Sequence, residues 1–441
     1  MSKHTPEAPQ DTDLESAYII HPEIKSQGNS LRALEYVLEE TQGLARAIDL
    51  EVCKTKVLNV SRIQAGSFIG KGQRDEIGEE IKELKPNVVV FNHPLSPVQQ
   101  RNLEKAWGAK VIDRTGLILE IFGARAQTKE GRLQVELAAL DYQRSRLVRS
   151  WTHLERQRGA TGFIGGPGET QIELDRRMIG DRITRLKKEL DNVRRTRELG
   201  RHSRARIPLP IVALVGYTNA GKSTLFNVVT ESNVFAEDLP FATLDPTLRR
   251  FDLPNNQQVI LSDTVGFISD LPTHLVASFR ATLEQTIHGD AIVHVIDVSR
   301  PDWRAQKQDV VDILKSLGIE YESDERIIEA YNKVDMLDEE RRADFVRDAK
   351  FSDNIAVISA LSGQGLDELL GKVVDVIAAA RTQECFHINA VDGKALSWLY
   401  EHAEVLSRKD DGATIELDVM IEPEDIDKFQ SRFSYSAKAA S

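Results

Sequence analysis

Short apolar runs alternate with amphipathic helical patterns in the first part of the chain, residues 16–128. The runs AYIIHPEI, VLNVS, NVVVFN and AKVIDRT have the pattern of strands, and helical stretches such as SLRALEYVLEETQGLARAI separate them. This alternation predicts a small α/β domain with a mostly parallel sheet. Residues 1–15 are polar and contain no apolar segment, so we expect a disordered N-terminus without a secretory signal.

Two long helical stripes follow, in residues 129–200. The apolar positions of the stripes recur every three, four or seven residues: Leu133, Leu137, Leu140, Leu147, Trp151 and Leu154, then Ile172, Ile179, Ile183, Leu186, Leu190 and Val193. Two such stripes joined by a short loop predict an antiparallel helical hairpin, with arms about 40 Å long at 1.5 Å per residue.

The tip of this hairpin, residues 158–169, reads RGATGFIGGPGE and contains five glycines. A glycine-rich loop can bind phosphate, but here no strand precedes the loop and no Lys-Ser/Thr follows it. We therefore interpret it as an adaptable loop rather than a nucleotide site. Thr170 and Glu173 match a capping box, which predicts that the second helix starts just after the loop.

The rest of the chain contains two further domains. A polar and basic linker, residues 201–208, precedes the strand LPIVALV, which begins an α/β domain covering residues 209–380. Residues 381–441 match no motif that we identify, but their alternation of strand-like and helical patterns predicts a small α+β domain. Its expected parts are a strand in FHINAV, a helix around KALSWLYEHAEVLSR, a strand in ATIELDVMI and a loose tail, SYSAKAAS.

Charge is distributed unevenly along this acidic chain. The 441 residues carry a net charge of −12, but residues 142–207 contain 17 Lys and Arg against 8 Asp and Glu. The basic charge is thus concentrated on the predicted hairpin, where it would suit nucleic acid. Two cysteines without metal-ligand spacing, and the lack of an apolar run long enough to span a bilayer, predict a soluble cytoplasmic protein.

The clearest chemical signal is the P-loop pattern G-x-x-x-x-G-K-[ST] in GYTNAGKS, between an apolar strand and a helix. The loop's backbone N–H groups would surround the β-phosphate, Lys222 would neutralise the β- and γ-phosphate oxygens, and the Ser223 hydroxyl would ligate Mg²⁺. The nucleotide-binding residues predicted here are Gly216, Tyr217, Thr218, Asn219, Ala220, Gly221, Lys222, Ser223 and Thr224.

Two motifs downstream complete a guanine-nucleotide site. In LSDTVGF, Asp263 would hold Mg²⁺ through water, and the N–H of Gly266 would contact the γ-phosphate. In EAYNKVD, the Asp335 carboxylate would accept hydrogen bonds from the guanine N1–H and 2-amino groups, which predicts GTP rather than ATP. The residues predicted to contact guanine are Asn332, Lys333, Asp335, Ser359, Ala360 and Leu361, the last three through backbone N–H groups.

In this order the motifs resemble the G1, G3, G4 and G5 elements of translation-factor-like GTPases. The likeness of LPFATLDPT to the Obg/HflX GTPases implies that Thr243, rather than Thr247, is the G2 residue that ligates Mg²⁺. Phe267 stands where Ras-like proteins have a water-orienting Gln, so intrinsic hydrolysis should be slow. Asn219 either ligates a potassium ion, as in several GTPases with an apolar residue after D-x-x-G, or simply suits the loop geometry. The predicted catalytic residues are Asn219, Lys222, Thr243 and Gly266.

Longer runs extend the resemblance to the bacterial HflX family over residues 17–380. These runs are IFGARAQTKEGRLQVELAALDYQRSRL, GFIGGPGETQIELDRR, FATLDPT and DTVGFISDLPTHLVASFRATLEQ. The resemblance implies a GTPase that binds the large ribosomal subunit, dissociates stalled or idle 70S ribosomes under stress, and is stimulated by the ribosome. We expect a monomer whose hairpin tip contacts ribosomal RNA through Arg158, Gly159, Phe163, Ile164, Gly165 and Gly166.

Two other functions stay open at this stage. A GTP-dependent ribosome assembly factor would bind a ribosomal precursor without splitting ribosomes, and no sequence feature separates it from the first hypothesis. An RNA-remodelling ATPase would use the N-terminal domain, where GSFIGKG at residues 66–72 resembles a phosphate loop only loosely. Because no Lys-Ser/Thr follows that segment, we favour a structural turn there.

Overall fold

The chain folds into two compact units, the first containing Met1–Lys187 and the second most of the chain from Lys188 onward. In this computed structural model the described residues are 15–24, 32–157, 167–202, 209–231, 240–241, 247–269, 287–379, 382–421 and 423–439. Among them, none of the helices combines the length and the apolar character that a membrane crossing requires. The predicted disordered N-terminus lies almost entirely outside the described residues.

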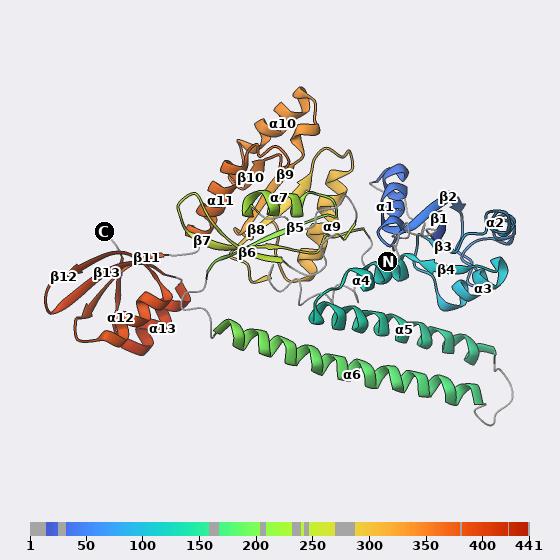
Figure 1. The fold of residues 1–441 in the computed structure, drawn as a ribbon, viewed down its shortest axis with the longest axis horizontal. Helices are drawn as coiled ribbons and strands as arrows, with labels where there is room; N and C mark the ends of the chain where they lie inside the picture. The colour runs from blue at the N-terminus through green and yellow to red at the C-terminus, as the bar shows by residue number, and fades with distance from the viewer. Residues whose placement is uncertain are drawn as a thin grey trace, which may run out of the picture. The chain divides into compact units, whose positions relative to one another are not determined.

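The N-terminal domain is a four-stranded parallel sheet of order β2-β1-β3-β4, as the alternating pattern predicts. In Figure 1, α2 and α3 pack together on this sheet, and α1 lies near α4. The elements are β1 (Glu15–Ile24), α1 (Leu34–Arg46), β2 (Leu50–Val60), α2 (Lys71–Leu84), β3 (Val88–Phe91), α3 (Pro97–Trp107), β4 (Lys110–Asp113) and α4 (Arg114–Arg125).

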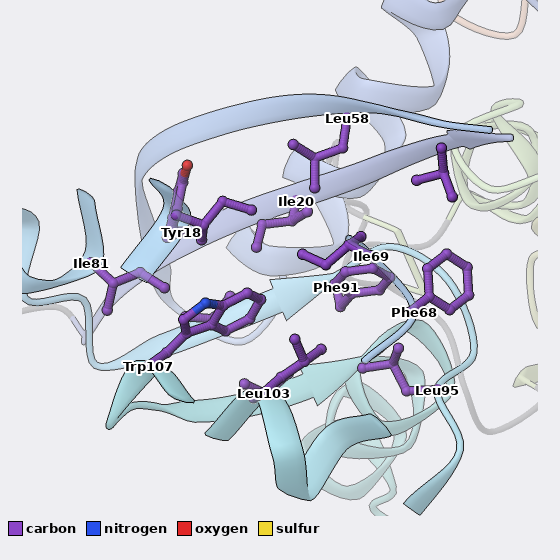
Figure 2. Close-up of a cluster of buried hydrophobic side chains, with 14 of the residues drawn as sticks. Tyr18, Ile20, Leu58, Phe68, Ile69, Ile81, Phe91, Leu95, Leu103 and Trp107 are labelled. Atoms are coloured by element: carbon purple, nitrogen blue, oxygen red, sulfur yellow. The ribbon is translucent and has the colours of Figure 1, made fainter. Parts of the chain in front are cut away.

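Within the segment 66–72, residues 66–70 form a turn that leads into α2, and the apolar residues of this turn belong to the core of the domain. Phe68 and Ile69 are buried against Phe91 and their neighbours (Figure 2), and the Phe68 ring meets the Phe91 ring edge-on at 5.1 Å. The Phe68 N–H and carbonyl both bond to the backbone of Gln64. With its side chains in the core and this backbone closed on itself, the turn gives no support to a second phosphate site.

The hairpin consists of α5 (Lys129–Gln157) and α6 (Pro167–His202). Of the predicted stripes, Leu133, Leu137, Ile183, Leu186 and Leu190 are buried, and an ion pair of 2.7 Å joins Arg182 to Glu136. Two boundaries were wrong. The second helix starts at Pro167 rather than after Thr170, because proline suits the first helical position, and it extends two residues into the predicted linker.

Two residues from a later part of the chain also belong to the first unit. Pro240 and Phe241, which follow α7 (Lys222–Thr230) in sequence, lie in the Glu237–Ala242 stretch of that unit. The Phe241 ring packs edge-on against the Phe122 ring with centroids 4.6 Å apart, and only 2% of Phe241 is exposed. Pro240 lies close to Gly43: a Cβ added to Gly43 would be 3.3 Å from Cγ of Pro240.

The predicted G domain is a six-stranded sheet of order β10-β9-β8-β5-β7-β6, parallel except for the β6–β7 pair. This order brings the carboxyl ends of β5, β7, β8 and β9 together at one edge, where open α/β sheets bind ligands. The elements are β5 (Ile211–Gly216), α7 (Lys222–Thr230), β6 (Thr247–Asp252), β7 (Gln258–Asp263), β8 (Ala291–Asp297), α9 (Trp303–Ser316), β9 (Ile327–Asn332), η2 (Val334–Met336), α10 (Glu339–Ala349), β10 (Ile355–Val357) and α11 (Leu366–Ala379).

The C-terminal domain is α+β, with a β-α-β-β-α-β order and an antiparallel sheet of order β12-β13-β11-β14. This is the ferredoxin-like arrangement, and α12 and α13 share one hydrophobic core with the sheet. The elements are β11 (Thr382–Asn389), α12 (Gly393–His402), β12 (Glu404–Asp410), β13 (Thr414–Ile421), α13 (Pro423–Phe433) and β14 (Ala437–Ala439).

Two predictions for this domain were wrong. The predicted helix ends at His402, and the residues after it form β12, because they pair with β13. The predicted loose tail contains β14, which pairs with β11 through Glu384 to Phe386. Backbone pairing with a distant strand decides both cases, and local apolar spacing does not reveal it.

Candidate functional site

The P-loop connects the end of β5 to the start of α7, and two glycines make its tight path possible. Gly216 has φ +152, and a Cβ there would lie 2.3 Å from the Val295 carbonyl oxygen. Gly221 has φ +98, and a Cβ there would lie 2.3 Å from the Asn332 side-chain nitrogen. Larger residues at either position would force the loop away from β8 and β9, so both motif glycines are required by close approach.

Lys222 is buried at the base of this loop, with 6% of its surface exposed. Its Nζ donates to the carbonyl oxygens of Gly216 at 3.1 Å and Tyr217 at 2.8 Å. Burial lowers the pKa of its ammonium to about 8, while the nearby Asp263 carboxylate acts in the opposite direction. A buried cation held in this way favours binding of an anion such as a phosphate.

Ser223, in the first turn of α7, meets Asp263 at the end of β7. The Ser223 hydroxyl donates to Oδ2 of Asp263 at 2.7 Å, and Asp263 is fully buried at the end of β7. A hydroxyl and a carboxylate so close together form the oxygen-donor set that Mg²⁺ prefers, so these two residues fit the predicted metal. Thr243, the third predicted ligand, lies outside the described residues.

The segment after Asp263 lies against the P-loop. The N–H of Thr218 donates to the Phe267 carbonyl at 2.8 Å, and the N–H of Phe267 donates to the Gly216 carbonyl at 3.1 Å. A Cβ on Gly266 would lie 2.9 Å from Cγ2 of Thr218, so a side chain here would collide with the loop. Phe267 itself is 2% exposed, so its ring lies in the interior, away from water.

Asn332 joins three segments of the site. Its amide Nδ2 donates to the Ala220 carbonyl at 2.8 Å, and its Oδ1 accepts from the N–H of Ala360 at 2.9 Å. Asn332 is 1% exposed at the end of β9, whereas Asp335, in η2, is exposed. The P-loop, the end of β9 and the loop after β10 are thus held together by one amide.

The remaining predicted residues occupy the same edge of the sheet. Ala220 and Ser359 are buried, Asn219 is exposed with φ +60, and Leu361 is 80% exposed. Asn tolerates this left-handed backbone well, so the geometry of Asn219 suits both the potassium hypothesis and a purely conformational role. The predicted hairpin-tip residues, Arg158, Gly159, Phe163, Ile164, Gly165 and Gly166, lie outside the described residues.

Sequence reasoning missed two contacts at this site. Asp297, the last residue of β8, forms an ion pair of 2.8 Å with Lys333. The Tyr217 hydroxyl accepts a hydrogen bond of 2.8 Å from the N–H of Ser269. An acidic residue ending the apolar run AIVHVID is a signal for the first contact, since Asp263 ends its strand in the same way.

Comparison with protein families finds four models that together match most of the chain. Their descriptions and matched residues are "GTP-binding GTPase N-terminal" (35–123), "GTP-binding GTPase Middle Region" (125–204), "50S ribosome-binding GTPase" (211–333) and "HflX C-terminal domain" (344–441). The last match gives residues 381–441 a relationship that the sequence motifs had not supplied.

Curated proteins named "GTPase HflX" are similar to this chain over most of their own lengths. The protein from Magnetococcus marinus is 49% identical over 374 residues, which cover 85% of this chain and 85% of that protein. The protein from Escherichia coli (strain K12) is 43% identical over 366 residues, which cover 82% and 84%. The protein from Lacrimispora saccharolytica is 45% identical over 340 residues, which cover 77% and 78%.

Proposed function

Because the chain belongs to the HflX family of GTPases, we propose that it binds the large (50S) ribosomal subunit and separates stalled or idle 70S ribosomes. The chain is a GTPase that hydrolyses GTP to GDP and phosphate. The observation that carries the ribosomal part is the match of residues 211–333 to the "50S ribosome-binding GTPase" model. Such a cycle operates in the cytoplasm, during stress that leaves ribosomes stalled.

We assign the nucleotide contacts from the geometry of the P-loop edge. The N–H groups of residues 217–224 surround the β-phosphate, and the buried ammonium group of Lys222 neutralises charge on the β- and γ-phosphates. Asn332 keeps the P-loop and the Ser359–Leu361 loop in register, so that Asp335 accepts from the N1–H and 2-amino groups of guanine. The γ-phosphate is contacted by the N–H of Gly266, which has no side chain to block the approach.

Ser223 and Asp263 are the described residues that would hold Mg²⁺, Asp263 through water, with Thr243 as the further ligand. Mg²⁺ held by these residues would supply positive charge to the phosphates. The protein's own contribution is to present the Ser223 hydroxyl and the Asp263 carboxylate together beside Lys222. A difference in the contacts of the Thr243 and Phe267 segments between the GTP and GDP states would make ribosome binding depend on the nucleotide.

Intrinsic hydrolysis is proposed to be slow, and the ribosome is proposed to complete the site. Phe267 cannot orient water, because its side chain is apolar and lies in the interior. Asn219 is exposed in the P-loop and is available to ligate potassium, which would supply the positive charge that other GTPases obtain from an arginine.

The hairpin is proposed to bind ribosomal RNA. On α6, Arg176, Arg177, Arg182 and Arg185 are exposed, whereas Ile183 and its stripe neighbours are buried. Basic side chains on the exposed surface of a helix can neutralise RNA phosphates, and an apolar residue in the tip, such as Phe163, could stack on an unpaired base. The tip glycines would let the loop adapt to a crowded RNA surface.

Sucrose-gradient sedimentation of purified 70S ribosomes tests this proposal. With saturating protein and either GTP or a non-hydrolysable analogue, we expect the 70S peak to convert into 50S and 30S peaks. Deleting residues 159–168 should abolish this conversion and leave GTP binding intact. If intact 70S ribosomes persist with the wild-type protein, the splitting proposal is wrong, and an assembly role, tested on 50S precursors, replaces it.

Matched charge substitutions distinguish RNA binding by the hairpin from a general effect of lost positive charge. Replacing Arg176 and Arg177 with Gln should weaken 50S binding and reduce its salt dependence, because each lost phosphate contact lowers the salt slope by about one. Replacing Arg342 and Arg347 of α10 with Gln removes the same charge elsewhere and should leave binding unchanged. Equal effects of the two pairs would contradict an RNA-binding hairpin.

A further inference from the structure

We propose that Asp297 is a positioning residue for guanine recognition, acting through its ion pair with Lys333. This inference rests on the proposed role of Asp335 in binding guanine. Asp297 does not occur in any of the nucleotide-binding motifs, yet its carboxylate is 2.8 Å from Nζ of Lys333, in the segment that carries Asp335. No role in the reaction follows for Asp297 from the motif pattern alone.

The carboxylate of Asp297 is held in a fixed place. Its side chain is 5% exposed at the last position of β8, and Oδ1 accepts from the N–H of Ser299 at 3.0 Å. Asp297 is the register partner of Asn332 on β9, and the N–H of Val298 donates to the Asn332 carbonyl at 3.1 Å. The position of this carboxylate is therefore set by the sheet rather than by a loop.

Lys333 adopts a backbone conformation that is unfavourable for a residue with a side chain. Its φ is +65° and its ψ is +32°, in the left-handed region, and it forms the N-cap of the 3₁₀ turn η2. Residues are held in this region only where their surroundings fix them. Among the described residues, the ion pair with Asp297 ties the Lys333 side chain to β8 and so helps to hold this conformation.

The conformation of Lys333 determines where Asp335 lies. The turn η2 closes directly on Lys333, since the N–H of Met336 donates to the Lys333 carbonyl at 3.1 Å. Asp335 is the middle residue of this turn, so rotation of the Lys333 backbone moves the Asp335 carboxylate. Its two hydrogen bonds to guanine need both donors in line, and the contact to the 2-amino group is lost first when the carboxylate turns.

Another buried carboxylate close by serves as the matched comparison. Asp302 follows the same strand, its side chain is 4% exposed, and it pairs with Arg300 at 3.3 Å. It is the N-cap of α9, and among the residues that the structure describes its carboxylate contacts Arg300 and Gln306 rather than the segment of Lys333 and Asp335. If any buried ion pair near the end of β8 affected nucleotide binding through general stability, Asp302 would do so as well as Asp297.

The experiment measures discrimination between GDP and IDP, which lacks the 2-amino group. Dissociation constants are obtained by displacement of a fluorescent GDP from the full chain. We expect Asp297→Asn to weaken GDP binding about tenfold and to lower the IDP/GDP ratio of dissociation constants at least threefold. The kcat of GTP hydrolysis at saturation should stay within twofold of wild type, because the described contacts of the Asp297 side chain are with Lys333 and Ser299, which we do not assign to the phosphates. Asp302→Asn should leave both constants unchanged.

Two further variants make the outcomes distinguishable. Lys333→Met should lower the IDP/GDP ratio as Asp297→Asn does, and the double variant should show no additional loss, because the two residues act as one unit. Asp335→Asn tests the proposed guanine contact itself. If Asp335→Asn leaves the ratio unchanged, the guanine assignment fails. If it lowers the ratio while Asp297→Asn does not, or if the Asp297 and Lys333 effects add, only the positioning role fails.

Discussion

Replacing Phe267 with Gln should not convert this chain into a faster GTPase, although Gln is the residue that orients water in Ras-like proteins. The backbone at this position is fixed by two hydrogen bonds to the P-loop, one from Thr218 and one to Gly216. These bonds direct the side chain into the interior, where the Phe267 ring is 2% exposed. A Gln at this position would therefore point away from the attacking water.

The magnitude follows from the contacts that Gln would have to break. Releasing both backbone hydrogen bonds costs about 1 kcal/mol each, so a conformer with the amide facing water is populated about one time in thirty. If the amide stays inside instead, the lost ring burial and the unpaired amide together destabilise the fold by about 3–5 kcal/mol. Neither arrangement places a water-orienting group at the γ-phosphate for most of the time.

Single-turnover hydrolysis of GTP without ribosomes, together with urea unfolding, tests this reasoning. We expect the hydrolysis rate of Phe267→Gln to stay within threefold of wild type, and its unfolding midpoint to fall clearly. Phe267→Leu keeps an apolar side chain and is the control, with a smaller loss of stability and the same rate. A tenfold faster hydrolysis by Phe267→Gln at an unchanged unfolding midpoint would refute the assignment of this side chain to the interior.

Two further predictions concern ions and protons. If Asn219 ligates potassium, GTP turnover should be several-fold faster in K⁺ than in Na⁺, and Asn219→Ala should remove the difference. Equal turnover rates of the wild-type protein in both salts would contradict the potassium hypothesis. Burial, with Lys307 and Lys222 nearby, lowers the pKa of His294 to about 3. The folded state thus keeps His294 neutral while the unfolded state takes up a proton below about pH 6.5, so stability should fall by about 1.4 kcal/mol per pH unit from there towards pH 3. The test is urea unfolding between pH 5 and 7.5, in which His294→Gln should reduce the dependence of stability on pH by one proton. An unchanged pH dependence in His294→Gln would contradict the assignment.

Much of the architecture could be predicted because the relevant signals are local. The P-loop motif is continuous in sequence, and its strand, turn and helix are each formed by neighbouring residues. The buried stripe of the hairpin likewise follows from helical spacing at positions such as Leu137 and Leu186. These features need no knowledge of which segments meet in space.

The features that could not be predicted depend on contacts between distant segments. Residues 404–410 continue an apolar spacing that looks helical, but pairing with β13 makes them a strand. Ala437–Ala439 has little intrinsic preference for a strand, and its backbone pairs with β11 regardless of its side chains. The contact between Asp297 and Lys333 could not be predicted either, because it depends on the pairing of β8 with β9, which places the Asp297 carboxylate beside Lys333.

The burial of Phe241 bears on how this protein can be divided into fragments. A fragment that ends between residues 203 and 208 would contain the whole N-terminal sheet and both hairpin helices, but it would lack the Phe241 ring that packs against Phe122. It would also lose Pro240, which lies beside Gly43 in the same unit. A stretch that comes 32 residues after residue 208 in the chain is therefore part of the first unit, and sequence order alone does not delimit that unit.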